Sequence, residues 1–351
     1  MKLKLLSFLI AIIFIFLLTA CEKQNIQSSS GTSSVVAESS SLPEVFSTIS
    51  KPENYSISFM PMDESDEYWK EMQSGCEQAV KKLEEDGINI DFSVDIGKYR
   101  QSENMSDVIN KVIAKNKDAI LITPTGSYII EDFVKARELG IKIIILETEL
   151  DGDDWDAAYY RDYYNDGKLA GEKMLEDLTS RGITSGKIGL IGMNKSVEPT
   201  SKREDGFKSA FENKGYEILE TKYCDGKPIE SKEATEELIN EDEVIGIFGS
   251  MGGSAAGVAI AVQETDKAEY ISVIGCDMSN YFFETNDYDS VDMEKLISSG
   301  VVYAAIKSDP YKMGYEAMME TIKALRGEEI NPKTTYIPPI VVTKENVEEY
   351  F

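Results

Sequence analysis

The chain has 351 residues, with 36 lysines and arginines, 63 aspartates and glutamates, and no histidine. Without histidine it cannot contain a Ser-His-Asp or Cys-His catalytic site, an HExxH protease motif or a His-ligated zinc. The formal charge of -27 argues against nucleic acid as a partner, because affinity for phosphate backbones comes mainly from lysine and arginine. With 42% hydrophobic residues the chain can bury a sizeable core, and its length predicts about two domains.

The N-terminus has the pattern of an export signal. Lys2 and Lys4 precede an almost wholly apolar run over residues 5–20, and no acidic residue occurs before Glu22. A basic segment followed by a short apolar segment is typical of a secretory signal. The run is shorter than the roughly 20 residues that a membrane-spanning helix needs. We therefore expect residues 1–20 to be a signal peptide.

The end of this segment, Leu18-Thr19-Ala20-Cys21, resembles the lipobox of bacterial lipoproteins, whose cysteine becomes the first mature residue and carries acyl chains. The resemblance implies that Cys21 is lipidated, which would hold the protein on the extracytoplasmic face of the cell membrane. The alternative is an ordinary secretory signal that happens to contain a cysteine. Residues 21–52 are rich in Ser and Thr without helical or strand periodicity, and we interpret them as a flexible tether.

Three cysteines remain in the body of the chain: Cys76, Cys224 and Cys276. Their odd number and wide spacing do not suggest a disulfide framework. We expect all three to be buried free thiols.

Beyond the tether, short apolar or β-branched runs alternate with amphipathic stretches. Strands are expected at residues 55–62, 88–96, 119–124, 142–148, 187–192, 217–224, 244–250, 270–277 and 301–307. Helices are expected at residues 68–85, 129–139, 166–181, 203–214, 232–240, 254–265 and 311–326. This alternation predicts an α/β fold with right-handed crossovers and parallel sheets. The alternation of strands and helices is interrupted at residues 151–164 and then continues, which favours two doubly wound lobes.

In open α/β sheets ligands bind beyond the carboxyl ends of the strands. Those ends carry Asp63, Asp66, Thr123, Glu147, Arg161, Asp162, Met251 and Asp277. The chain has neither a GxGxxG fingerprint nor a GxxxxGK[ST] loop, so dinucleotide and nucleoside triphosphate sites are unsupported. Gly249–Gly253 is the nearest approach to a phosphate loop, but it lacks the lysine and is interpreted as a tight turn. We expect no cofactor and no metal.

Six segments resemble, in order and at nearly the same spacing, the ribose-binding-protein type of periplasmic sugar receptor, a type I periplasmic binding protein. They are Ile57–Leu83 with Tyr68-Trp69 and Gly75, Ile120–Thr125, Gly167–Gly171, Arg203–Phe207, Gly275–Asp277 and Asp309–Gly314. The resemblance extends from Tyr55 to the C-terminus. It implies two doubly wound parallel-sheet lobes joined by a three-crossing hinge. It also implies a monomeric, non-enzymatic substrate-binding protein of an ABC sugar importer.

Transferred to this sequence, the crossings fall near Arg161, Ser308 and Ile337. The N-terminal lobe would comprise residues 53–161 plus 309–337, and the C-terminal lobe residues 162–308 plus 338–351. A ligand caught between the lobes would stabilise a closed state.

In the first lobe the resemblance implies that Tyr68 and Trp69 are stacking aromatics, although both could instead pack at a helix start. Asp66 would accept a ligand hydroxyl, cap the helix, or do both. Glu147 holds a position where many relatives carry aspartate followed by arginine, but here Thr148 follows. Arg161 would supply a cation to the ligand or form a hinge salt bridge.

In the second lobe Arg203 matches the family's ligand arginine, and its alternative is a surface cation at the start of an amphipathic helix. Asp277 matches a ligand carboxylate. Met251 and Ser308 occupy ligand positions where relatives carry polar or longer amide side chains. The chain is about ten residues longer than typical relatives within 278–300, where Tyr281-Phe282-Phe283 could cover the cleft or pack locally.

These features predict an extracellular lipoprotein that captures a small polar solute, a monosaccharide or related polyol, and delivers it to ABC permease subunits. The alternative is a ligand-sensing receptor for a membrane histidine kinase or chemoreceptor, because both functions use the same cleft. A hydrolase that pairs the carboxylate of Asp66 with that of Glu147 or Asp277 is a further alternative.

Overall fold

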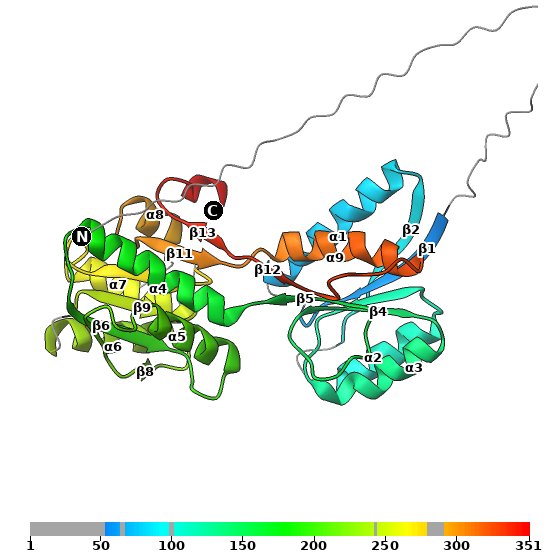
Figure 1. The fold of residues 1–351 in the computed structure, drawn as a ribbon, viewed down its shortest axis with the longest axis horizontal. Helices are drawn as coiled ribbons and strands as arrows, with labels where there is room; N and C mark the ends of the chain where they lie inside the picture. The colour runs from blue at the N-terminus through cyan, green and yellow to red at the C-terminus, as the bar shows by residue number, and fades with distance from the viewer. Residues whose placement is uncertain (1–52, 64–66, 98–101, 242–243, 279–290) are drawn as a thin grey trace, which may run out of the picture. The chain divides into compact units, whose positions relative to one another are not determined.

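The computed structural model describes residues 53–63, 67–97, 102–241, 244–278 and 291–351 (Figure 1). The expected signal peptide and tether, Cys21, Asp66 and the aromatic run at residues 281–283 lie outside the described residues. Within the described ranges no helix is long and apolar enough to cross a membrane.

The first sheet has six strands in the order β12-β5-β4-β3-β1-β2, all paired in parallel. Their bounds are β1 Glu53–Met60, β2 Ile88–Val94, β3 Ala119–Ile122, β4 Lys142–Glu147, β5 Ala157–Arg161 and β12 Thr334–Ile337. Helices α1 (Glu67–Glu85) and α9 (Pro310–Leu325) cover one face, and α2 (Ser102–Ala114) and α3 (Ile130–Glu138) cover the other, with the short helix η1 (Ser127–Ile129) before α3 (Figure 1). The central strands are buried on both faces, and their sequences are therefore continuous apolar runs.

The second sheet has the order β13-β11-β10-β9-β6-β7, with β8 also paired to β6, and only β13 runs antiparallel to its neighbour. Its strands are β6 Gly186–Gly192, β7 Tyr216–Ile218, β8 Lys222–Tyr223, β9 Gly246–Gly249, β10 Ser272–Cys276, β11 Ala304–Lys307 and β13 Ile340–Val342. Helices α4 (Tyr163–Ser180) and α5 (Glu198–Ala210) share one core with this sheet. The opposite core involves α6 (Pro228–Glu241), α7 (Gly252–Glu264), α8 (Met293–Ser298) and η2 (Val347–Glu349).

The chain passes between the two sheets three times. β5 ends at Arg161 in the first sheet, and α4 begins at Tyr163 on the second. β11 ends at Lys307, and α9 then packs on the first sheet. Finally β12 leads into β13 of the second sheet. The expected α/β fold, with two parallel sheets and a three-crossing hinge, is therefore confirmed.

Glycines of the sequence motifs lie where paired helices touch through their backbones. A Cβ at Gly167 on α4 would lie 1.8 Å from the Arg203 carbonyl oxygen, and one at Gly206 on α5 would lie 1.9 Å from the Tyr164 oxygen. Gly75 on α1 approaches Tyr311 of α9 in the same way. Only glycine permits these approaches, and the α4–α5 contact fixes the position of Arg203.

Several elements differ from the expectation. The prediction omits α2, although Met105, Val108, Ile109 and Val112 are buried at helical spacing, so periodicity could have revealed it. It also omits β5, β12, β13 and α8, which are three to six residues long. The single strand predicted at residues 217–224 is wrong, because β7 and β8 pair separately with β6.

Candidate functional site

A cavity of about 540 Å³ lies at the carboxyl ends of strands from both sheets. Eight of the nine residues proposed from the sequence line it: Tyr68, Trp69, Glu147, Arg161, Arg203, Met251, Asp277 and Ser308. The ninth, Asp66, lies outside the described residues. The structure thus brings together side chains that are spread over 240 positions of the sequence, and their contacts decide what the cavity can bind.

Asp277 connects two buried arginines. It follows β10 directly, with a φ of +53°. Its Oδ1 lies 2.8 Å from Arg161 Nη1, and its Oδ2 accepts a hydrogen bond of 2.5 Å from Arg203 Nη2. Asp166 on α4 accepts a further hydrogen bond of 2.5 Å from Arg161 Nε. Two carboxylates thus balance two guanidinium groups, as burial of charge requires.

Arg203 is only 3% exposed and lies in the second turn of α5, which begins at Glu198 rather than at residue 203. Its Nη1 donates to the Ser250 carbonyl oxygen at 3.1 Å. The alternative of a surface cation is therefore wrong. Arg161 is 5% exposed and forms the expected ion pairs at the first crossing.

The charges set the protonation of this cluster. Burial acts to raise the pKa of Asp277, but the nearby Arg161 and Arg203 outweigh it and lower the pKa to about 2. For Asp166 the balance is reversed, and burial raises the pKa in spite of the same two arginines. Asp277 is therefore a carboxylate at neutral pH, and a third of its side chain is exposed. It can accept hydrogen bonds from a ligand.

Glu147 forms a second polar centre at the end of β4. It has a φ of +68° and is 7% exposed. It accepts one hydrogen bond from the Tyr68 hydroxyl and another, of 2.7 Å, from the Tyr163 hydroxyl. Burial and the Glu147 carboxylate raise the pKa of both tyrosines well above the usual range, so both hydroxyls remain donors.

Tyr163, the first residue of α4, was not proposed from the sequence. Its ring lies 5.5 Å from the Arg161 guanidinium carbon and 5.2 Å from that of Arg203, within the range of cation–π attraction. It thereby connects the two polar centres. The only signal in the sequence is its place two residues after Arg161, at a chain crossing.

Three residues that line the same cavity contain buried donor atoms without partners. Trp69 Nε1, Arg161 Nη2 and Arg203 Nε have no hydrogen-bond acceptor among the described residues. Trp69 is 7% exposed and meets Tyr68 edge-on at 4.8 Å, so it packs in the core and also lines the cavity. An unsatisfied buried donor costs about 1–3 kcal/mol.

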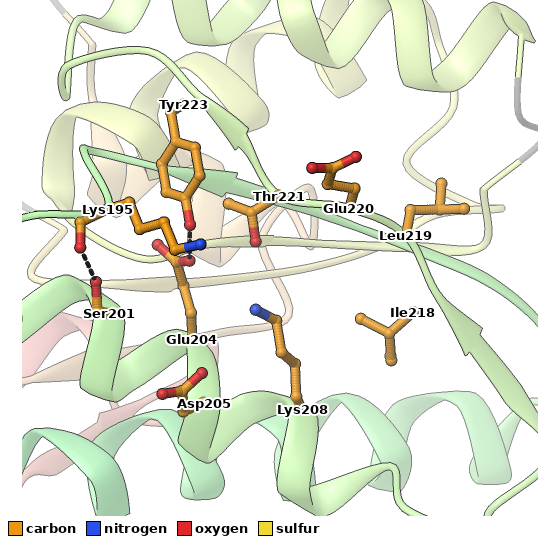
Figure 2. Close-up of a pocket in the computed structure, with 10 residues that line it drawn as sticks. All are labelled: Lys195, Ser201, Glu204, Asp205, Lys208, Ile218, Leu219, Glu220, Thr221 and Tyr223. Atoms are coloured by element: carbon orange, nitrogen blue, oxygen red, sulfur yellow. Dashed lines mark hydrogen bonds between the residues drawn. The ribbon is translucent and has the colours of Figure 1, made fainter.

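A larger hollow of about 750 Å³ lies between α5 and the β7–β8 segment (Figure 2). Glu204, 1% exposed, accepts hydrogen bonds from Tyr223 and Ser250, and burial raises its pKa. Lysines and acidic residues mix around it, and none of the proposed ligand residues lines it. The cavity at Asp277 is therefore the candidate site.

No group of three or more Cys, Asp or Glu in the described ranges could hold a metal ion. Cys76, Cys224 and Cys276 are free thiols in the structure, and Cys76 and Cys276 are buried. The expected burial is wrong for Cys224, which is only partly buried.

Comparisons with known proteins find chains similar in sequence and in fold. The ribose import binding protein RbsB of Haemophilus influenzae is 23% identical over 227 residues, which cover 64% of this chain and 72% of that protein. A periplasmic solute-binding protein of an ABC transporter from Actinobacillus succinogenes, solved with D-allose, is 24% identical with a TM-score of 0.68, covering 84% of this chain and all of the other. A mutant XylFII–LytSN complex contains a chain that is 20% identical with a TM-score of 0.64. The match covers 84% of this chain and all of the other.

The family model of the periplasmic binding protein domain matches residues 57–329, more than three quarters of the chain. Members of this family bind solutes and are not enzymes. The chain therefore belongs to the periplasmic binding protein domain family.

Proposed function

We propose that this protein captures a monosaccharide or related polyol in the cavity at Asp277 and delivers it to an ABC importer. The observation that carries the proposal is the convergence of Arg203, Asp277, Glu147 and two aromatic residues on one cavity at the ends of two parallel sheets. Charged groups make strong hydrogen bonds to hydroxyls, and aromatic rings pack on the apolar faces of a sugar ring. The relatives that bind ribose and D-allose support the same class of solute.

Capture would proceed by hinge closure, which is established for periplasmic binding proteins. We assign the N-terminal lobe to residues 53–161 plus 309–337 and the C-terminal lobe to residues 162–308 plus 338–351. A solute that contacts Trp69 and Glu147 on one side and Arg203 and Asp277 on the other would bind the closed state more tightly than the open one. That difference in affinity is all that closure requires.

The N-terminal sequence supports a location on the outer face of the cell membrane. A signal peptide at residues 1–20, a lipidated Cys21 and a tether over residues 21–52 would leave a monomeric binding body beside the permease subunits. Replacement Cys21→Ser should release the protein into the medium and abolish incorporation of labelled palmitate. Retention of the label in this variant would contradict lipidation at Cys21.

Sensing is the second candidate, because one similar chain was solved in a XylFII–LytSN complex. In that case the sugar-loaded protein would bind the extracellular domain of a membrane kinase rather than the permease. Uptake of radiolabelled sugar by cells with and without the protein separates the two functions. Unchanged uptake together with a lost transcriptional response would favour sensing.

Isothermal titration against pentoses, hexoses, inositols and nucleosides tests the solute class. We expect at least one of the sugars or polyols to bind in the micromolar range or tighter. Binding of none of them would contradict the proposal.

A further inference from the structure

The side chains that line the candidate cavity change from polar to apolar along the edge of the second sheet. The adjacent strands β11, β10, β9 and β6 all end there. Ser308 follows β11 and Asp277 follows β10, whereas Met251 lies just beyond β9 and Met193 just beyond β6. The lining therefore passes from polar to apolar across four neighbouring strands.

The two methionines lie side by side. A side-chain carbon at Gly226 would come within 2.7 Å of Met251 Sδ and 3.4 Å of Met193 Cγ, so both side chains meet over this glycine. Pro199 on α5 extends the apolar surface. We call Met193, Pro199 and Met251 the methionine wall. Thr200 beside it is 3% exposed and donates its hydroxyl to the Val197 carbonyl at 3.0 Å.

The first sheet repeats the gradient. Arg161 ends β5 and Glu147 ends β4, and both are polar. Met62 lies two residues beyond β1, and Trp69 of α1 lies beside that end. β5 and β11 are the strands that run into the first two chain crossings. At the strand ends of both sheets, then, the polar lining adjoins the hinge and the apolar lining lies away from it, while Glu67 and Glu71 of α1 add acidic side chains to the lining.

Met251 is poorly explained by helix stability. It is the N-cap of α7 and makes no side-chain capping hydrogen bond, whereas Ser, Thr, Asp and Asn are favoured at such positions. A methionine here gives up that bond, lines the cavity and packs its thioether beside Gly226.

A hydroxyl pressed against the methionine wall would lose its water without gaining a hydrogen bond, whereas a methyl group would gain from burial. We propose that the wall selects a monosaccharide with a carbon substituent in place of a hydroxyl on the edge remote from the hinge, such as a 6-deoxyhexose. This inference rests on the proposed function, because it specifies which sugars the same cavity takes.

Titration of the mature protein with matched sugar pairs tests the inference. Each pair differs by one oxygen: D-galactose and D-fucose, L-mannose and L-rhamnose, D-glucose and 6-deoxy-D-glucose. In the pair that binds most tightly, we expect the deoxy sugar to bind about ten-fold or more tightly than its parent. A parent that binds as well as its deoxy partner overturns the inference but leaves the proposed function standing. If no sugar binds, both fail.

The variant Met251→Gln tests the role of the wall. A glutamine offers hydrogen bonds at the same place, so the preference for the deoxy sugar should fall to about three-fold or less. The control Met319→Gln, on α9 and outside the cavity lining, should keep the full preference. An unchanged preference in Met251→Gln overturns the inference. Circular dichroism verifies folding, and Met193→Gln provides the same test if Met251→Gln does not fold.

Discussion

Arg203 donates a hydrogen bond of 2.5 Å to Asp277. Arg203 lies on α5 and Asp277 follows the end of β10, so the bond joins two elements that pack around the second sheet. Both are residues that a solute would contact. Before a solute arrives, the two charges satisfy each other, which keeps the cavity formed. A sugar hydroxyl can join this pair without separating it, because Asp277 retains free acceptor capacity.

Asp277 should make the fold sensitive to acid. Its pKa of about 2 in the folded protein lies below the value of about 3.9 in an unfolded chain. The native state therefore binds fewer protons, so Asp277 stabilises the fold fully above about pH 4 and loses this contribution as the pH falls toward 2. A third of the side chain is exposed. Solvent screening therefore reduces the contribution of Asp277 to the free energy of unfolding to about 1–2 kcal/mol.

Urea unfolding of the wild type and Asp277→Asn at pH 6 and pH 3 measures this contribution. The difference in unfolding free energy between the two proteins should shrink at pH 3. The exposed Asp205→Asn serves as the control. Equal differences at the two pH values would show that Asp277 is not linked to folding in this way.

Trp69→Phe should weaken sugar binding about five-fold or more, because it keeps an aromatic ring but removes the unpartnered Nε1 donor. The unfolding free energy should fall somewhat, because phenylalanine fills less of the core cluster than the indole does. Titration calorimetry measures the effect. The matched control is Trp155→Phe, which makes the same change at a buried position outside the cavity. Equal losses in the two variants would mean that Nε1 does not contact the solute.

Tyr163 and Glu147 should be energetically coupled through their 2.7 Å hydrogen bond. In a double-mutant cycle of Tyr163→Phe and Glu147→Gln, the two effects on unfolding free energy should differ from additivity by about 1–2 kcal/mol. Urea denaturation of the four proteins provides the measurement. Additive effects would mean that the hydrogen bond does not contribute to stability.

Gly206→Ala should force α4 and α5 apart, because the added carbon would lie 1.9 Å from the Tyr164 carbonyl oxygen. We expect a loss of about 1–3 kcal/mol in unfolding free energy and weaker sugar binding, since Arg203 is carried on α5. Lys208→Ala, on the same helix, is the control. Unchanged binding in Gly206→Ala would contradict a positioning role for the helix contact.

Much of the fold could be predicted because buried parallel strands and amphipathic helices leave strong patterns, as in Ile143–Leu146 of β4. Short segments such as β12 and β13 are too brief to show a period. Among the site residues, Arg203 and Asp277 could be predicted from the motifs that resemble the family. Tyr163 and Met193 were not, because an aromatic residue or a methionine next to an apolar strand looks the same whether it faces a core or a cavity.

The crystal structure of the complex with the tightest-binding sugar tests the central claim most directly. We expect the sugar to lie in the cavity at Asp277, with hydrogen bonds to Asp277 or Arg203 and contact with Trp69. A sugar bound elsewhere, for example in the hollow beside Glu204 (Figure 2), would contradict it.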